Sequence, residues 1–435
     1  MTVDELSTTS ATEAPPVALE PLPVELEPPP AGVDVAPPGV PLWRVVAALF
    51  VAGLAFRGPV LVVGPLLPEI QADLAIPHGV AGLLSSIPVL CMAILAPLGP
   101  VLAASIGPTR VVTACLATVA GFGLLRAVAP GAAPVILLTV GIGLGMGVVG
   151  PVLAQVVRRA APRNPELGTG AYAMGYIVGA SSTAALAVTL AAVLGGWRGA
   201  FAAVSVGAIG SLVAWWLLAP HDGHGRRIAL RRPTLPWRRG IAWLFGIVFG
   251  IQSLLFHAGV AWLASIYLER GWAAADGALL TALFSGMGII ATLVVPLVTT
   301  AIRSRRLQLA AASLAALLGA IGVAAGGGGG PAGDPLAVPS VALFGFGVGL
   351  TFPLCLTLPL DASDSPVEAS SVAALMLMVG YLISSIGPVL LGSIRDATGD
   401  FAIAGWLIAA ISVLLLAGTL SLTAHRIHGP PARPA

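Results

Sequence analysis

The chain has 435 residues, of which 57% are hydrophobic and only 9% are charged, whereas about a quarter of the residues in soluble domains are charged. A soluble fold needs more surface charge, so this composition excludes an ordinary cytosolic enzyme and a disordered or fibrous chain, and it predicts an integral membrane protein of several helices. The net charge of +2, with scattered arginines, provides no basic groove and argues against a nucleic-acid partner.

Residues 1–41 form a compositionally distinct segment. They contain ten prolines, seven acidic residues and no basic residue. A secretory signal requires a positive start followed by an apolar stretch, and this segment has neither. Because its acids and prolines cannot bury a core, we expect a disordered tail with no binding role, or alternatively a tail that docks a partner.

Apolar stretches long enough to cross a bilayer, which takes about 20 residues, recur from Trp43 onward. They predict twelve transmembrane helices, at 43–66, 79–105, 109–128, 133–157, 168–194, 198–219, 239–267, 275–301, 306–325, 336–360, 367–393 and 401–424. The resulting fold is all-α, with two six-helix bundles. The expected domains are an N-terminal bundle at 42–219, a basic linker at 220–238, a C-terminal bundle at 239–424 and a short tail at 425–435.

The arginines predict the orientation of these spans. If the first tail is cytoplasmic, sixteen of the 21 arginines fall on the cytoplasmic side, and four, Arg126, Arg198, Arg270 and Arg395, fall on the opposite side. The positive-inside rule therefore places both termini in the cytoplasm. The basic residues include no lysine, which together with abundant alanine, glycine and proline indicates a GC-rich bacterial genome and hence a bacterial plasma (inner) membrane.

The two halves of the sequence repeat each other. A shift of 202 residues places Gly143, Gly145, Gly147 and Pro151 on a second set with the same spacing, which begins at Gly345 and ends at Pro353. A repeat with the same topology in both halves implies a pseudo-two-fold axis along the membrane normal and a cavity between the bundles near the midplane. Glycines spaced in this way let neighbouring helices approach closely on more than one face.

Arg57 is the most informative residue, because a guanidinium inside a membrane span must find a partner. No acidic residue lies in the middle of a predicted span, and Glu69 and Asp73 are expected beyond the outer end of the first one. Backbone carbonyls, hydroxyls or an anionic substrate remain as partners. Pro59 leaves the carbonyl of Ala55 without its helical donor. Arg57 is therefore a candidate substrate-binding residue, with a structural arginine as the alternative.

His257 is the second ionisable group inside a span, and it aligns one helical turn beyond the position equivalent to Arg57. A histidine can change charge near neutral pH, so His257 is a candidate for substrate binding and for proton coupling, or else a neutral packing residue. Tyr176, Gln252 and Tyr381 are candidate secondary ligands, or alternatively helix–helix hydrogen-bond partners. The three cysteines lie in apolar runs, and we expect neither a metal nor a cofactor.

Four stretches carry a family resemblance: FRGPVLVVGPLLPEI at 56–70, AGLLSSIPVLCMAILAPLGP at 81–100, GIQSLLFHAGVAWLASIYLERG at 250–271 and GYLISSIGPVLLGSIRDATG at 380–399. The chain resembles a major facilitator superfamily transporter, within the branch that includes cyanate permeases and 2-nitroimidazole transporters. It departs from the usual pattern at Ala104, where an Asp is expected between spans 2 and 3. It also lacks the Gly-Pro pattern that is typical of the fifth span in drug antiporters.

The resemblance implies a secondary transporter of the major facilitator fold, not an enzyme, which moves a small anionic, weak-acid or heteroaromatic solute, cyanate-like or nitroimidazole-like, by alternating access. A proton-coupled exporter of drugs or metabolites is the alternative, but it predicts a membrane-embedded carboxylate that the spans lack. An intramembrane enzyme would need paired catalytic groups, and His257 is isolated. A non-transporting receptor is a more distant alternative, since no appended folded domain is apparent.

Overall fold

The computed structural model describes residues 41–220, 235–363 and 365–423. Within these segments the secondary structure is helical and contains no strand, as the composition predicts. The predicted tail, apart from its last residue, lies outside the described residues. So do most of the basic linker and the tail at 425–435.

The described helices form twelve spans that are long and apolar enough to cross a membrane, which confirms the predicted number. In the N-terminal half the helices are α1 (Leu42–Leu61), α2 (Val63–Leu74), α3 (His78–Ala81), α4 (Leu83–Leu95), α5 (Leu98–Ile106), α6 (Pro108–Ala127), α7 (Ala132–Ala160), α8 (Pro165–Val193) and α9 (Trp197–Leu218). In the C-terminal half they are α10 (Gly240–Glu269), α11 (Ala274–Ala301), α12 (Arg305–Ala325), α13 (Gly330–Gly333), α14 (Ala337–Asp361), α15 (Pro366–Ser384), α16 (Ile386–Thr398) and α17 (Ala402–Leu420).

Some spans consist of two consecutive helices. The first span is interrupted at Val62, between α1 and α2, and the eleventh is interrupted at Ser385, between α15 and α16. Each interruption lies three residues before a proline that lacks the N–H needed to continue the helical ladder, Pro65 in the first span and Pro388 in the eleventh. The sequence therefore dictates both breaks.

The first span, Leu42–Leu74, is longer than the predicted range 43–66. Helix α2 continues to Leu74, so Glu69 and Asp73 lie on the last turns of a helix and not beyond its end. Both carboxylates are engaged by the start of α9: Glu69 accepts the backbone N–H of Trp197 at 2.9 Å, and Asp73 forms an ion pair with Arg198. The extra helical turns thus tie the first span to the sixth.

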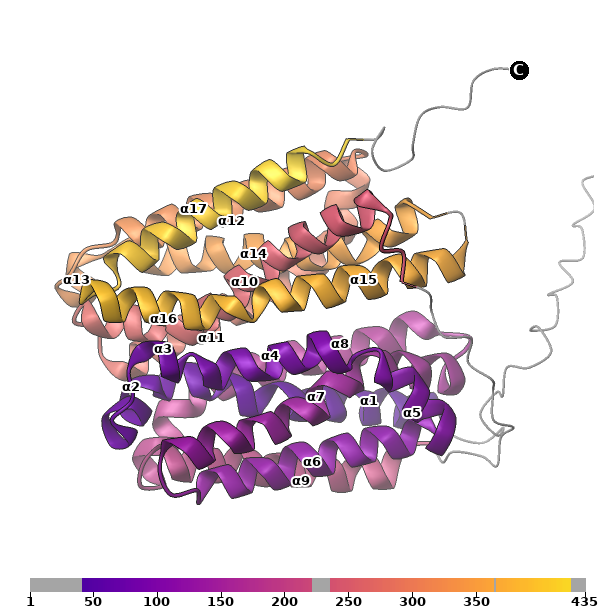
Figure 1. Ribbon diagram of the computed structural model, residues 1–435, viewed down its shortest axis with the longest axis horizontal. Coiled ribbons are helices and arrows are strands. Elements are labelled where there is room, and N and C mark those ends of the chain that lie inside the picture. Colours follow the sequence, from indigo (N-terminus) through magenta and orange to yellow (C-terminus); the bar gives the residue numbers. More distant parts are fainter. Residues whose placement is uncertain (1–40, 221–234, 364, 424–435) are drawn as a thin grey trace, which may run out of the picture. The chain divides into compact units, whose positions relative to one another are not determined.

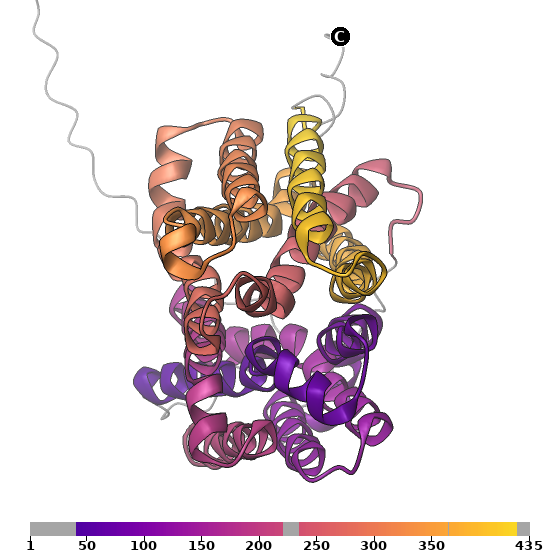
Figure 2. The same ribbon diagram turned by 90° about the vertical axis from the view of Figure 1, so that its left-hand side faces the viewer.

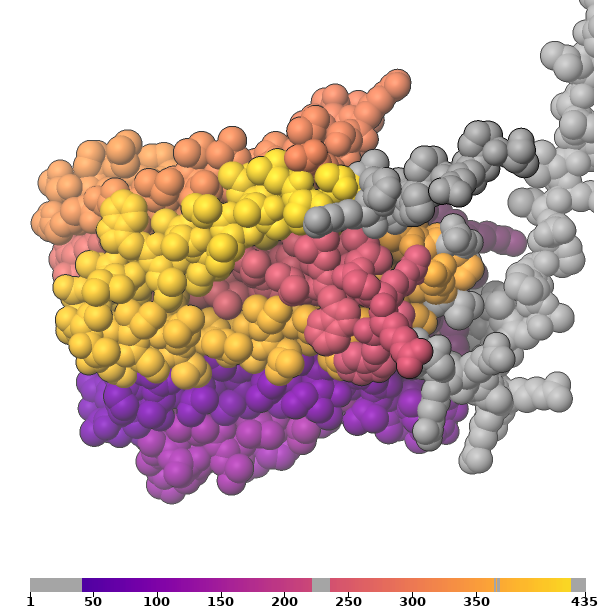
Figure 3. Space-filling view, turned by 45° about the horizontal axis from the view of Figure 1, so that its top comes forward, coloured from indigo at the N-terminus to yellow at the C-terminus, as the bar shows by residue number. Residues whose placement is uncertain are grey.

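The spans of each half gather into a bundle of their own (Figure 1). Figure 2 shows the spans nearly end-on, with the N-terminal half in indigo to magenta and the C-terminal half in red to yellow. On the face drawn in Figure 3 the two halves lie against each other. The seventh span, α10, is the most deeply buried of the twelve, and it carries His257.

The repeated glycines make the same contacts in both halves. Gly143 and Gly147 of α7 face the second span, at Cys91, whereas Gly145 faces the third span, at Cys115. At the equivalent positions of α14, the outer two glycines face α11 and the middle one faces α12. A side chain at these positions would collide with the neighbouring helix, so glycine is what permits close packing on two faces.

Candidate functional site

Two close helix crossings position the candidate residues. Gly53 of α1 packs against Gly175 of α8, where an added Cβ would lie 3.0 Å from the partner's Cα. Gly250 of α10 packs in the same way on Gly380 of α15, at 3.2 Å. These crossings hold spans 1 and 5 together in one bundle and spans 7 and 11 together in the other. The residue after each second glycine is a tyrosine, Tyr176 or Tyr381.

Arg57 lies one helical turn after Gly53 and is only partly buried. Its guanidinium carbon is 5.5 Å from the centre of the Tyr176 ring, a cation–π distance. Among the described residues no hydrogen bond or ion pair engages this guanidinium.

His257 is 4% exposed and is held within the C-terminal bundle. Its Nδ1 lies 2.8 Å from the carbonyl oxygen of Ser253 and 3.0 Å from Oγ of Ser384 on α15. A carbonyl can only accept, so Nδ1 carries the proton of the neutral ring and Nε2 presents its lone pair. Nε2 is buried and has no partner among the described residues.

Three of the other four predicted residues lie around Arg57. Its charge lies within electrostatic range of Tyr176 in its own bundle and of His257 and Tyr381 in the other. Tyr172 joins this group, with its ring 5.7 Å from that of Tyr176. One cationic group, one imidazole and three phenols thus come from spans 1, 5, 7 and 11.

Gln252 stands apart from this group. Its Nε2 donates to the carbonyl of Val348 in α14 at 3.0 Å, and its Oε1 is buried without a partner among the described residues. The contact is a helix–helix hydrogen bond inside the C-terminal bundle, the role that the sequence offers for Gln252 as an alternative to substrate binding. A direct role in binding would require the Oε1 atom.

The acidic residues of the described segments lie at or near helix ends. Several pair with arginines at those ends: Arg270 with Asp334 at 3.9 Å, Arg305 with Asp361 at 2.8 Å and Arg395 with Glu269 at 2.9 Å. The group around Arg57 therefore carries a positive charge with no acid against it. Such an arrangement attracts anions and polarised neutral molecules and repels cations.

The sequence predicts Arg126 at the outer end of its span but does not predict that it is buried. In the structure it lies in the last turn of α6 at 1% exposure. Its Nη2 donates to the carbonyl of Pro59 at 2.8 Å, and its guanidinium carbon lies 4.2 Å from the centre of the Phe201 ring. An arginine at the end of a span can reach water or turn inward, and only the neighbouring helices decide which.

Ser384 and Tyr172 are not among the residues predicted from the sequence. Ser384 Oγ contacts Nδ1 of His257, whereas Oγ of the adjacent Ser385 donates to the carbonyl of Leu382 in α15. Adjacent residues on a helix point about 100° apart, so the choice between them needs the position of the neighbouring helix. The spacing of Tyr172 and Tyr176, one helical turn, was the signal for Tyr172.

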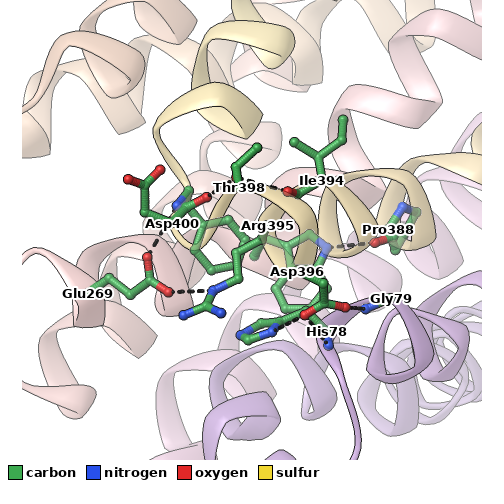
Figure 4. A network of polar contacts seen from close by, with 11 residues as sticks. His78, Gly79, Glu269, Pro388, Ile394, Arg395, Asp396, Thr398 and Asp400 are labelled. Carbon is green, nitrogen blue, oxygen red and sulfur yellow. Dashed lines mark hydrogen bonds and ion pairs between the residues drawn. The ribbon is translucent and has the colours of Figure 1, made fainter.

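The bundles also meet at one end of the molecule, where α3 and α16 lie (left in Figure 1). Asp396 of α16 accepts hydrogen bonds from the backbone N–H of His78 at 3.0 Å and of Gly79 at 2.8 Å, and its Oδ1 lies 2.7 Å from Nδ1 of His78 (Figure 4). The His78 ring packs on Trp262 and Phe401, each with centres 5.7 Å apart. We call this end the His78 end.

Glycines line the contact between the bundles at the His78 end. Gly64 of α2 lies directly on the carbonyl of Val260 in α10, and a Cβ there would collide with it. Gly82 lies on α16, where a Cβ would be 2.6 Å from the carbonyl oxygen of Pro388. We call these contacts the glycine seam. The two bundles approach to backbone contact at this end because no side chain separates them.

Comparison with known proteins assigns the family. The sequence model of the Major Facilitator Superfamily matches residues 45–388. The chain is 27% identical to the 2-nitroimidazole transporter of Escherichia coli (strain K12), over 85% of this chain and 93% of that protein. It is also 27% identical to the cyanate transport protein CynX of the same organism, over 85% of this chain and 94% of that protein.

Solved structures share the fold. A bacterial homologue of the human lysosomal transporter Spinster, in an inward-facing and occupied conformation, superposes with a TM-score of 0.70 at 15% identity, covering 90% of this chain and 98% of that one. The likeness agrees with twelve spans in two bundles. The chain is therefore a multi-pass membrane transporter that belongs to the Major Facilitator Superfamily.

Proposed function

We propose that the protein is a secondary active transporter of a small anionic or weak-acid, heteroaromatic solute. The observation that carries this proposal is the Arg57 guanidinium, which lies among groups of both bundles with no acid against it. A guanidinium keeps its charge at any physiological pH and offers several donors in one plane, which suits a carboxylate-like or linear anion. An intramembrane charge of this kind is commonly part of a substrate path.

The groups around Arg57 match both solute types. Tyr172, Tyr176 and Tyr381 supply aromatic faces and hydroxyls for a flat ring. The free lone pair of His257 Nε2 could accept an N–H from a weak acid such as an azole. Two relatives are transporters of 2-nitroimidazole and of cyanate, which supports the same pair of chemistries. The contrasting candidate, an exporter of cationic drugs, would need a carboxylate in the middle of a span, whereas the acidic residues of the described segments lie at or near helix ends.

Transport would proceed by alternating access of the central site. The glycine seam and the Asp396 contacts close the His78 end, and opening that end requires these contacts to break. We assign the His78 end to the outside. The arginines placed there, Arg198, Arg270 and Arg395, each pair with an acid, which leaves the excess positive charge at the opposite, cytoplasmic end. Both termini would then be cytoplasmic in a bacterial plasma membrane.

The direct test is uptake of radiolabelled cyanate and of 2-nitroimidazole into proteoliposomes. Removing one charged hydrogen bond to an anion should lower uptake of the transported probe by about tenfold or more in Arg57→Gln. Arg57→Lys keeps the charge but not the planar donor set, so it should retain part of the rate for an anion. Arg44→Gln is the matched control, because Arg44 also lies on α1 but bonds the Leu217 carbonyl at the far end.

Unchanged uptake and affinity in Arg57→Gln would remove Arg57 from the site. Uptake of neither probe by the wild-type protein, with reconstitution verified by protein orientation and amount, would contradict the proposed solute class. A thermal-shift screen against small anions and azoles then gives an independent reading, because a ligand of the folded state raises apparent stability.

Proton coupling through His257 is the finer part of this proposal. The residue is buried within electrostatic range of Arg57, and its Nε2 has no partner among the described residues. A coupling role predicts that His257→Asn flattens the dependence of transport on an imposed pH gradient, because an amide cannot carry the proton. A variant that transports with the wild-type pH profile would end that role. The Ser412→Ala variant is the control, since Ser412 is also buried in the C-terminal half but its Oγ donates to the Ile408 carbonyl of its own helix.

A further inference from the structure

Arg126 is a buried cation that the proposed transport path does not use. It is 1% exposed, its Nη2 donates to the carbonyl of Pro59, and its Nε and Nη1 have no partner among the described residues. No ion pair to Arg126 occurs within the described segments. Burying a guanidinium in this way is costly, and an apolar side chain would fill the same place at less cost. Stability alone therefore does not explain the residue.

The carbonyl that Arg126 binds belongs to the part of the first span that presents Arg57. Pro59 is two residues after Arg57 and three before the interruption at Val62. The ladder is incomplete here, because Pro59 cannot donate to Ala55 and Pro65 cannot donate to Leu61. A helix segment with missing donors bends easily unless another group holds it.

Arg57 lies between two points at which α1 is fixed. On one side Gly53 is pressed against Gly175 of α8. On the other side the Pro59 carbonyl is held by Arg126 of α6. The direction of Arg57 toward the opposing bundle is therefore set from both sides, and Arg126 supplies the second constraint.

The same contacts continue across the interruption. The Arg126 guanidinium stacks on Phe201, whose ring is 5.1 Å from that of Trp197. The backbone N–H of Trp197 donates to Glu69 and its indole N–H donates to Asp73 at 3.1 Å, so α2 is held as well. Spans 3 and 6 thus clamp both parts of the first span around its break.

We propose that Arg126 is a positioning residue for Arg57, which fixes the interrupted stretch of the first span through the Pro59 carbonyl. The inference rests on the proposed function for its effect on transport, but its structural part can be measured without any solute.

Hydrogen–deuterium exchange of the reconstituted full chain tests the structural part. Arg126→Gln should accelerate exchange of backbone amides in the segment 55–67 relative to wild type, because the clamp on that segment is lost. Arg44→Gln is the matched control. Like Arg126, Arg44 donates to a backbone carbonyl of a neighbouring span, that of Leu217 in α9, but Arg44 lies at the far end of α1 from the segment 55–67. Equal exchange of the segment 55–67 in Arg126→Gln and wild type would overturn the proposal.

Transport kinetics with cyanate or 2-nitroimidazole as probe test the consequence. Arg126→Gln should raise the KM for the probe about tenfold, the effect of one misaligned charged hydrogen bond, and Arg126→Lys should recover part of it. In an Arg57→Gln background the Arg126 substitution should add nothing further to KM, because the two residues act as a unit. A purely structural role would instead lower the maximal rate and leave KM unchanged.

The outcomes separate the two proposals. If exchange of the segment 55–67 is faster in Arg126→Gln but the wild-type protein transports neither probe, the positioning role is retained and the proposed solute class is contradicted. Normal exchange with normal KM in Arg126→Gln contradicts the positioning role and leaves the transport proposal intact. If Arg126→Gln does not fold, the same exchange and KM measurements on Arg126→Lys test the positioning role. The lysine ammonium can reach the Pro59 carbonyl but cannot stack on the Phe201 ring as a guanidinium does.

Discussion

Removing the Asp396 carboxylate should open the His78 end. Asp396→Ala deletes three contacts between the bundles: the hydrogen bonds from the backbone N–H groups of His78 and Gly79, and the contact with Nδ1 of His78. A hydrogen bond to a charged group contributes about 1.5–3 kcal/mol when buried, and less when solvent reaches it. The side chains of His78 and Asp396 are 20% and 29% exposed, so we expect about 2 kcal/mol for the set.

A change of about 2 kcal/mol shifts the ratio of closed to open molecules by about 30-fold. Ser86→Cys is a suitable reporter, because Ser86 is 5% exposed and lies one turn after Gly82, on the face that packs on α16. The native cysteines, Cys91, Cys115 and Cys355, are replaced by alanine in this background. A membrane-impermeant maleimide added from outside should label the reporter much faster in Asp396→Ala.

Asp73→Ala is the matched control for this experiment. Asp73 pairs with Arg198 at the same end of the protein, but both residues belong to the N-terminal bundle. Its removal should leave the labelling rate of the reporter close to that of wild type. Equal acceleration in both variants, or none in Asp396→Ala, would refute the reasoning that Asp396 holds the two bundles together.

Two further predictions concern glycines. Gly64→Val places a side chain against the Val260 carbonyl and should also accelerate labelling of the reporter, whereas Gly121→Ala, with no atom within 4 Å of its new Cβ, should not. Gly53→Ala introduces a Cβ against the backbone of α8 and should lower stability by about 1–3 kcal/mol, which appears as a lower melting temperature of the purified protein in detergent. Gly170→Ala on α8 is the control and should melt like wild type, because its Cβ meets open space. A melting temperature of Gly53→Ala equal to that of the control would show that the α1–α8 crossing tolerates a side chain.

The number of spans and their division into two halves follow from the amino-acid sequence alone, since membrane insertion depends on the hydropathy of contiguous segments. The close helix packing at the alternating glycines of spans 4 and 10 is also predicted by the sequence, because their spacing assigns successive glycines to different helix faces. Arg57 and His257 stood out as candidates because ionisable groups inside spans are rare. Tyr176 and Tyr381 were candidates because a phenol can orient a small solute, and in the structure both of them and His257 lie within electrostatic range of Arg57.

The directions of side chains at span ends and on neighbouring helix faces depend on how the helices pack, and the sequence does not predict them. Arg126 turns inward to the Pro59 carbonyl, although its place in the sequence is equally compatible with water. Ser384 and not Ser385 reaches His257, because the facing helix selects one of two residues about 100° apart. The contact of His78 with Asp396 joins residues 318 positions apart. It exists only where two bundles meet, which no local pattern of hydropathy specifies.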